Sequence, residues 1–262
     1  MRRTFHYSFI TIVWLSLCLA ACASKTETAD IKTPLDPTLI AGNISKADEL
    51  SREHNDLSKM REAVKLLAQT RDLNNRNYEV EWKFARCSYF LGKLISDEKE
   101  SDKIFKEGEA AGNIASRVEP NKPEGYFWYG ANLGEQAKRS PLTKGLSSVD
   151  DIRSAMNKVI EIEPAYQGAS AFAALAQIEL STGLVGGKPE KAVEYLEKAI
   201  ELEKENSYVR LRLAQAYLAV KRDAEAKKQL DYIMRMKPDP EYLPEFEEST
   251  REAKKLLATK FK

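Results

Sequence analysis

The chain has 262 residues, 31% of them charged, and 41 lysines and arginines nearly balance 40 aspartates and glutamates. A formal net charge of +1 with both signs interspersed gives neither the basic footprint of a nucleic-acid-binding protein nor a basic membrane-binding patch. Three cysteines and two histidines are too few for a disulfide-rich scaffold or a dense metal site.

The N-terminus has the three zones of a secretory signal. Arg2 and Arg3 are positive, residues 9–19 are largely apolar, and small residues precede Cys22. The apolar stretch is shorter than the ~20 residues that a permanent membrane-spanning helix needs. We therefore predict a signal peptide over residues 1–21. The alternatives are an ordinary signal peptide with an incidental cysteine, or an uncleaved anchor.

The segment Leu19-Ala20-Ala21-Cys22 resembles the lipobox of bacterial lipoproteins, in which the cysteine thiol is acylated and becomes the first residue of the mature chain. The resemblance implies lipidation of Cys22. Ala23 stands where an aspartate would retain such a protein in the inner membrane, so the resemblance also implies outer-membrane anchoring, facing the periplasm. More than one acyl chain is usual in this class, which is enough for stable anchoring.

Polar residues rich in Ser, Thr, Lys, Asp and Pro follow, and we expect a flexible lipidated tether over residues 22–44. Removing residues 1–21 takes away Arg2 and Arg3 and changes the formal net charge to about −1. Cys87 then remains as the one free thiol, so we expect no intramolecular disulfide. Residues 45–262 are assigned to a single helical repeat domain.

Apolar residues at helical spacing predict a helix over residues 57–73 and a second one around Trp82. A third helix is expected over residues 104–118. Because Trp82 and Trp128 are 46 residues apart, a long connection is expected at residues 96–101. Two more helices follow in the sequence, one beginning near Pro123 and one over residues 152–162.

The second half of the chain repeats a pattern of small and apolar residues with a period of 34: Ala192, Leu196 and Ala199 are followed by Ala226, Leu230 and Ile233. This is the period of the tetratricopeptide repeat, a helix pair that buries its apolar face only when stacked on the next pair. The clearest repeats span residues 167–238, and a capping helix is expected over 240–261. Strand-like alternation is absent from the sequence. The predicted fold is all-α, an α-solenoid of about four divergent tetratricopeptide-like helix pairs plus flanking and C-terminal capping helices.

Residues suited to catalysis or metal binding are sparse. His54 has no partner at metal-ligand spacing and is interpreted as a solvated surface residue. Cys87 is interpreted as a small interior side chain. The run Gly186-Gly187-Lys188-Pro189 lacks the spacing of a phosphate-binding loop and is interpreted as a turn, with Pro189 opening the next helix. We expect no enzymatic activity, no metal and no cofactor.

In tetratricopeptide solenoids the first helix of each pair lines the concave surface. Here that surface is expected to be aromatic, aliphatic and amide-bearing, with few lysines or arginines, which suits an apolar ligand or an amphipathic partner helix better than a peptide carboxylate. The alternative is that these side chains only fill a tight superhelix. The predicted binding residues are Val80, Phe90, Tyr126, Tyr129, Leu133, Gln136, Gln177, Tyr208, Leu211 and Gln215.

Residues 128–135 and 186–192, together with 252–257, resemble the family shared by the T components of tetratricopeptide-associated TRAP transporters (TatT) and the eukaryotic regulators of microtubule dynamics. The likeness covers about residues 55–258. It implies divergent helical repeats and, in the transporter branch, an apolar tunnel and association with a periplasmic solute-binding protein. The lipobox favours this bacterial branch.

Two functions follow as hypotheses. The first is an interaction scaffold that holds a protein partner at the outer membrane. The second is an auxiliary T-type subunit of a TRAP-type uptake system, which binds an apolar organic ligand and associates with a solute-binding protein. Both require a protein partner and a membrane contact through the N-terminal lipid, and both are compatible with a homo-oligomer. Neither involves nucleic acid.

Overall fold

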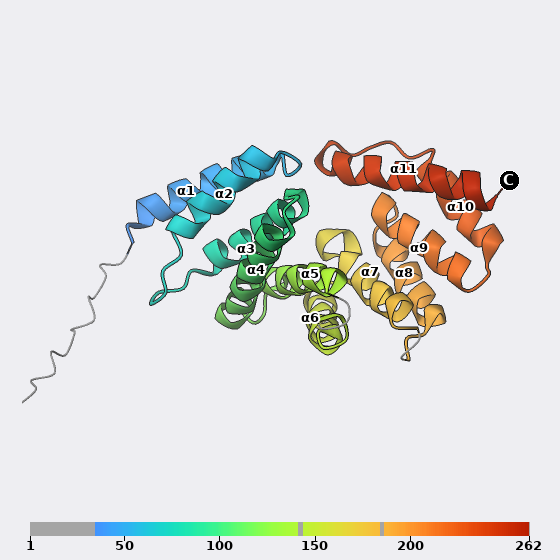
Figure 1. Ribbon diagram of the computed structural model, residues 1–262, viewed down its shortest axis with the longest axis horizontal. Coiled ribbons are helices and arrows are strands. Elements are labelled where there is room, and N and C mark those ends of the chain that lie inside the picture. The colour runs from blue at the N-terminus through green and yellow to red at the C-terminus, as the bar shows by residue number, and fades with distance from the viewer. Residues whose placement is uncertain (1–34, 141–143, 184–185, 262) are drawn as a thin grey trace, which may run out of the picture. The chain divides into compact units, whose positions relative to one another are not determined.

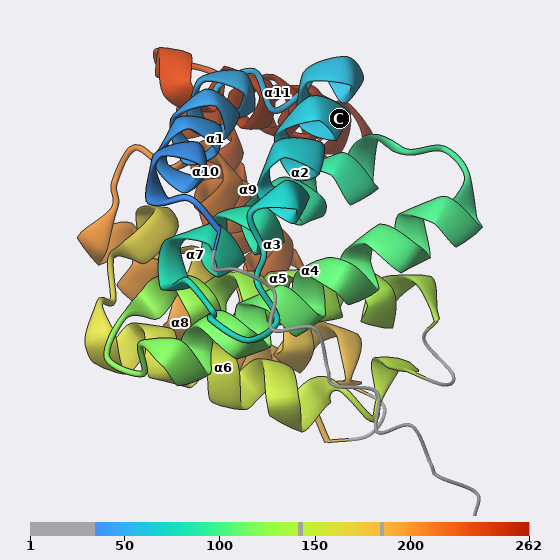
Figure 2. The same cartoon turned by 90° about the vertical axis from the view of Figure 1, so that its left-hand side faces the viewer.

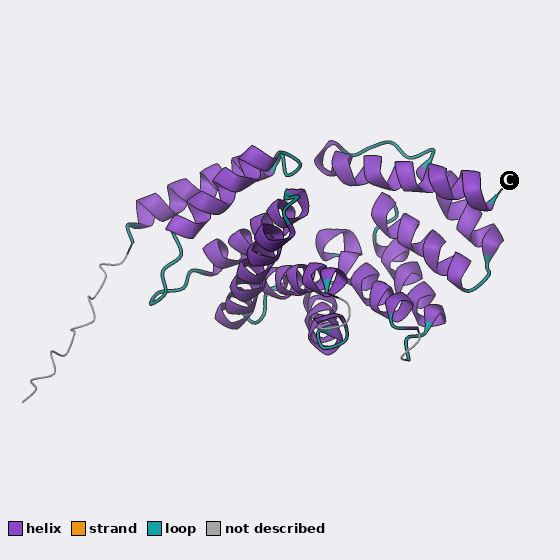
Figure 3. Cartoon of the chain, in the orientation of Figure 1, coloured by secondary structure: helices purple, strands orange, loops and turns teal. Residues whose placement is uncertain are grey.

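The structure is a computed structural model that describes residues 35–140, 144–183 and 186–261. The signal peptide, Cys22 and most of the tether lie outside the described residues. Within the described ranges all regular secondary structure is helical (Figure 3). None of the helices described there is long and apolar enough to cross a membrane.

The described residues belong to one compact unit that begins at residue 34. Its helices follow in chain order as α1 (Pro37–Ser51), α2 (Leu57–Gln69), α3 (Tyr78–Leu94), α4 (Glu98–Val118), α5 (Pro123–Arg139), α6 (Val149–Ile162), α7 (Tyr166–Ser181), α8 (Pro189–Leu202), α9 (Ser207–Ala219), α10 (Asp223–Ile233), a 3-10 turn (Pro240–Tyr242) and α11 (Leu243–Lys260) (Figure 1).

The helices form two layers. Each helix packs against the next in the chain, and the odd-numbered helices also contact one another in succession, from α1 with α3 through to α9 with α11. The odd-numbered helices therefore form one continuous layer, called the inner layer below. In this unit α6 lies on one side, and α1, α2 and α11 lie together on the opposite side (Figures 1 and 2).

The repeat positions predicted from the 34-residue period are core positions. Ala192, Leu196 and Ala199 of α8 and their counterparts Ala226, Leu230 and Ile233 of α10 are all fully buried. Small residues there let neighbouring helices approach closely, while leucine and isoleucine fill the space beside them. The predicted all-α solenoid is confirmed, with α3–α4, α5–α6, α7–α8 and α9–α10 as its four pairs. A fifth pair, α1–α2, precedes them, and α11 packs on α9 and α10.

The first helix corrects the predicted extent of the tether. Residues 37–44, which the sequence predicts as flexible, are the first half of α1. The Asp36 side chain accepts a hydrogen bond from the Thr38 backbone N–H at 2.9 Å, and Pro37 occupies the first turn. Asp, Thr and Pro are typical of loops in composition, but in this order they are helix-starting residues.

The start of α4 corrects a second expectation. Residues 98–101 are helical, so the long connection expected at 96–101 is only a short turn. Asp97 caps the helix by accepting from the Glu100 N–H at 2.7 Å, and the buried Ser101 hydroxyl donates to the Gly92 carbonyl at 2.6 Å. The α3–α4 pair is longer than a standard repeat because its helices are long, with 17 residues in α3 and 21 in α4.

The N-terminal turn of α7 has an unusual backbone. Gln167, Gly168 and Ala169 have φ angles of 50°, 62° and 60°, in the left-handed region that disfavours residues with a side chain. The Asn206 side-chain amide stabilises this turn by donating to the Gly168 carbonyl at 2.8 Å. The regular helical part of α7 therefore begins only after Ala169.

Candidate interaction surface

Four of the ten predicted binding residues lie in the protein interior. Val80, Leu133, Gln136 and Leu211 are at most 4% exposed. Val80 and Leu133 belong to the large core of α1–α7, and Leu211 packs with residues of α10 and α11. These side chains support the helices of the inner layer and do not line an open surface.

On α5 the predicted face points toward neighbouring helices. A Cβ atom on Gly112 of α4 would lie only 2.5 Å from the Tyr129 backbone nitrogen, so α4 and α5 are almost in backbone contact there. The Gln136 amide donates to Glu109 of α4 at 2.7 Å. Tyr126 is half-buried against the same core. The predicted concave face of α5 is therefore wrong in part, because the sequence does not show which side of this helix α4 covers.

The remaining four predicted residues, Phe90, Gln177, Tyr208 and Gln215, are half-buried on α3, α7 and α9 of the inner layer. Whether any of the ten binds a ligand stays a prediction. Phe90, Tyr208 and Gln215 make specific side-chain contacts with neighbouring residues. These contacts outline a surface that the sequence did not reveal.

Phe90 is the centre of a cluster of aromatic rings from three inner helices and the α1–α2 loop. Its ring centroid lies 4.5 Å from His54, 5.3 Å from Tyr89 and 5.7 Å from Trp128. The cluster continues from Trp128 through Phe127, 5.0 Å away, to Tyr166 of α7 at a further 5.4 Å. Ring separations of this size are favourable for tilted and edge-to-face pairs. We call these six residues the aromatic cluster.

His54 is not the solvated surface residue that the sequence predicts. Its side chain is only 14% exposed, and its Nε2 atom lies 3.0 Å from Oε1 of Glu245 in α11. Burial raises the pKa of the Glu245 carboxyl, but the hydrogen bond and charge of His54 outweigh burial, so the pKa is lowered overall. His54 and Glu245 are 191 residues apart in the sequence, so residue spacing could not predict this contact.

Charged and polar groups lie close to the aromatic cluster. Lys138 of α5 pairs with Glu135 at 2.7 Å. On α9 the Arg212 guanidinium lies 4.9 Å from the Tyr208 ring and donates to Gln215 at 2.9 Å. Burial, and then the nearby charge of Glu135, raise the pKa of Tyr89, which keeps its hydroxyl protonated.

Two other predictions about single residues are confirmed. Cys87 is fully buried, and burial raises the pKa of its thiol to about 11. Gly186 and Gly187 form a turn, and Pro189 begins α8 in its first turn. Among the described residues, no group of three His, Cys, Asp or Glu side chains is placed to hold a metal ion. The expectation that the protein is not an enzyme stays a prediction.

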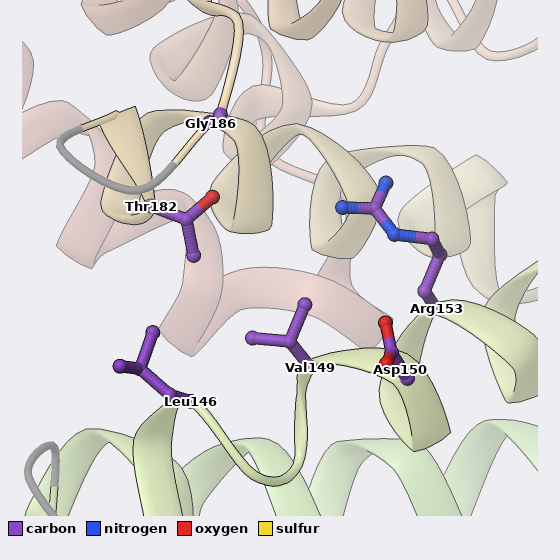
Figure 4. A pocket seen from close by; sticks show the side chains of 7 residues that line it. Leu146, Val149, Asp150, Arg153, Thr182 and Gly186 are labelled. Carbon is purple, nitrogen blue, oxygen red and sulfur yellow. The ribbon is translucent and has the colours of Figure 1, made fainter.

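Two surface pockets lie away from the aromatic cluster. One, between α6 and the end of α7, is lined by Leu146, Val149, Asp150, Arg153, Thr182, Gly186 and Gly187 (Figure 4). Beside it the Arg153 guanidinium donates to the buried Glu179 at 2.6 Å, and the other Glu179 oxygen accepts from the Lys188 N–H. The second pocket is lined by Arg76, Ile114, Arg117 and Val118. Neither pocket contains a residue of the aromatic cluster.

Two protein-family models match separate parts of the chain. The model of the tetratricopeptide repeat matches residues 186–243, and the model of regulator of microtubule dynamics protein 1-3 matches residues 43–172. No curated protein matches the sequence. The assignment to the transporter branch of the resembling family stays a prediction.

Several solved structures are similar to this chain to different degrees. A tetratricopeptide-repeat protein of Thermus thermophilus is 18% identical with a TM-score of 0.60, over 82% of this chain and 99% of that one. MamA (16% identity, TM-score 0.48, 83% and 95% covered) and PilF of Pseudomonas aeruginosa (14%, 0.48, 85% and 92%) are more distant in structure. The paired helices, the matched repeat model and the Thermus structure together define a tetratricopeptide-like repeat protein.

Proposed function

We propose that the protein is a helical-repeat scaffold that binds a protein partner through its inner layer. The observation that carries this proposal is the surface built by α3, α5 and α9, where half-buried aromatic rings are bordered by Arg212, Lys138 and Gln215. Tyrosine, tryptophan and arginine are the residues that dominate binding energy at protein interfaces. Aromatic rings with a polar border match the anatomy of such interfaces.

We further propose that a lipid on Cys22 holds this scaffold at the outer membrane, on the periplasmic side. The lipobox-like segment supports this, as does the position of the first helix. Because α1 begins at Pro37, only 14 residues separate Cys22 from it. A fully extended chain of that length spans at most about 50 Å, so partners would be bound close to the membrane.

Capture from detergent-solubilised membranes with the full-length chain as bait tests the interaction. Tyr208→Ala and Arg212→Ala should each reduce recovery of the partner at least tenfold, because both side chains face the inner surface. Met234→Ala changes an exposed apolar residue that directly follows α10, and it is the matched control. Equal recovery with all four baits, at unchanged helical content, would refute the proposed surface.

Membrane fractionation tests the anchor separately. Cys22→Ala should move the protein from the membrane fraction to the soluble one or leave its signal peptide uncleaved, and labelled palmitate should be incorporated only by the parent chain. Equal palmitate incorporation in both chains would rule out Cys22 as the attachment site.

The alternative is an auxiliary T-type subunit of a TRAP-type uptake system. The half-buried apolar ring of Phe90 favours it, since this ring could contact an apolar organic ligand. The scaffold is preferred because the two pockets described above are lined by other residues. Recovery of a solute-binding protein in the same capture experiment, with an organic acid retained in native mass spectra, would decide for the transporter subunit.

A further inference from the structure

The two ends of the helical array meet. The α1–α2 loop lies beside the N-terminal turn of α11, although most of the chain separates them in sequence (Figure 1). The contact between them is the 3.0 Å hydrogen bond from His54 to Glu245. It is an ion pair whenever His54 is protonated.

Both side chains are held in place by their surroundings. The His54 ring packs on Phe90 with a tilt of 36°, so the aromatic cluster of the inner layer fixes its orientation. Glu245 uses Oε1 for His54, while its Oε2 atom is buried without a hydrogen-bond partner. A carboxylate oxygen buried without a partner costs free energy. Because Oε2 is already unpaired, the hydrogen bond from His54 to Oε1 is needed to hold the Glu245 carboxylate in this position.

The α1–α2 pair and α11 each pack mainly on other helices. In the described structure α11 packs on α9 and α10, whereas α1 and α2 pack on each other and on α3. Breaking the His54–Glu245 contact would therefore separate the ends without removing a core side chain. Partly exposed contacts of this kind open locally at a small fraction of the cost of global unfolding.

We propose that His54 and Glu245 form a latch that closes the array across its inner layer, and that opening this latch exposes the inner surface to the protein partner. The second half of this proposal rests on the proposed function. The closed state covers Phe90 with the His54 ring, so a partner that uses Phe90 must displace it. A partner that binds only the open state shifts the population toward it.

One further charged group stabilises the Glu245 carboxylate. Lys93 of α3 attracts it, whereas Tyr89, which lies beside Phe90 on the same helix, is uncharged. In the loop, Glu53 is paired with Lys59 and Asp56 caps α2, so neither competes for His54. Because the pKa of Glu245 is lowered, its contribution is fully present above the ordinary value of 4.5 and is lost as the pH falls through the folded-state pKa.

Hydrogen–deuterium exchange of the full-length chain in detergent micelles tests the latch. His54→Gln and Glu245→Gln should each raise exchange at least fivefold in residues 51–57 and 243–250, while residues 104–112 of α4 stay unchanged. Glu247→Gln, an exposed carboxylate on the same helix, should leave the parent pattern intact. The double variant should exchange no faster than either single one, because both variants weaken the same interaction.

If both latch variants exchange like Glu247→Gln, the latch is refuted. Should His54→Gln lose helical content, His54→Lys keeps a cation opposite Glu245 and must retain the parent protection. Capture experiments then separate the two proposals: open variants should recover several-fold more partner. If the latch variants exchange faster but capture the same amount of partner, the proposed regulation by the latch is wrong. If Tyr208→Ala captures as much partner as the parent chain, the proposed binding surface on the inner layer is wrong.

Discussion

The two parts of the helical array are held together by different chemistry. From α1 to α6 the helices are joined by ion pairs, aromatic rings and glycines. Glu81 is 1% exposed and pairs with Arg71 and Arg76. The partly exposed Asp48 of α1 binds Lys83 and Arg86 of α3. From α8 to α10 the core is mainly alanine and leucine at repeat spacing. The regulator of microtubule dynamics model matches the first part and the tetratricopeptide model the second. One repeat architecture thus tolerates two kinds of core.

The difference shows what each kind of core demands. An alanine–leucine core is non-directional, so its pattern can recur from repeat to repeat. A buried ion pair needs every partner in place and specifies one particular junction. The first part should therefore be more sensitive to single polar substitutions, and the second to changes of side-chain volume.

The largest effect is expected from Glu81→Ala, which leaves two arginines without their carboxylate. We expect a loss of about 3–5 kcal/mol in unfolding free energy, measured by urea denaturation. Glu100→Ala removes the exposed partner of Arg61 and is the matched control, with a much smaller expected loss because solvent screens this pair. Similar losses for the two variants would show that the ion pairs of Glu81 stabilise the α1–α6 part no more than an exposed ion pair does.

Leu196→Ala should cost slightly less, about 2–4 kcal/mol, because it opens a cavity in the repeat core of α8. The conservative change Leu196→Met should cost under about 1.5 kcal/mol. If Leu196→Met proved as damaging as Leu196→Ala, the second part would depend on precise shape and the contrast between the two cores would weaken.

The smallest effect is expected at the junction between the two parts, where Gln167 has a φ of 50°. Gln167→Gly should stabilise the protein by about 0.5–1 kcal/mol, since glycine adopts this conformation without strain. Gln177→Gly, in the regular part of α7, should destabilise it by about 1 kcal/mol. A melting temperature lowered by Gln167→Gly would mean that the left-handed turn is not strained.

The sequence could predict what depends on local spacing. The 34-residue recurrence of Ala192 and Ala226 indicated the repeat, and Pro189 marked a helix start, because helix pairing and capping act over a few turns. It could not reveal the partner of His54, since that contact depends on how all the intervening helix pairs stack. Nor could it fix which face of α5 is concave, because Gly112 on a different helix decides how closely α4 approaches.

The buried thiol of Cys87 has a practical consequence. With a pKa of about 11 it is almost entirely protonated at neutral pH, and in the folded chain no reagent can reach it. The Cys87 thiol is therefore protected from oxidants while the chain is folded. Because α3 must detach before the sulfur becomes reactive, the rate of Cys87 alkylation measures how often the helical core opens.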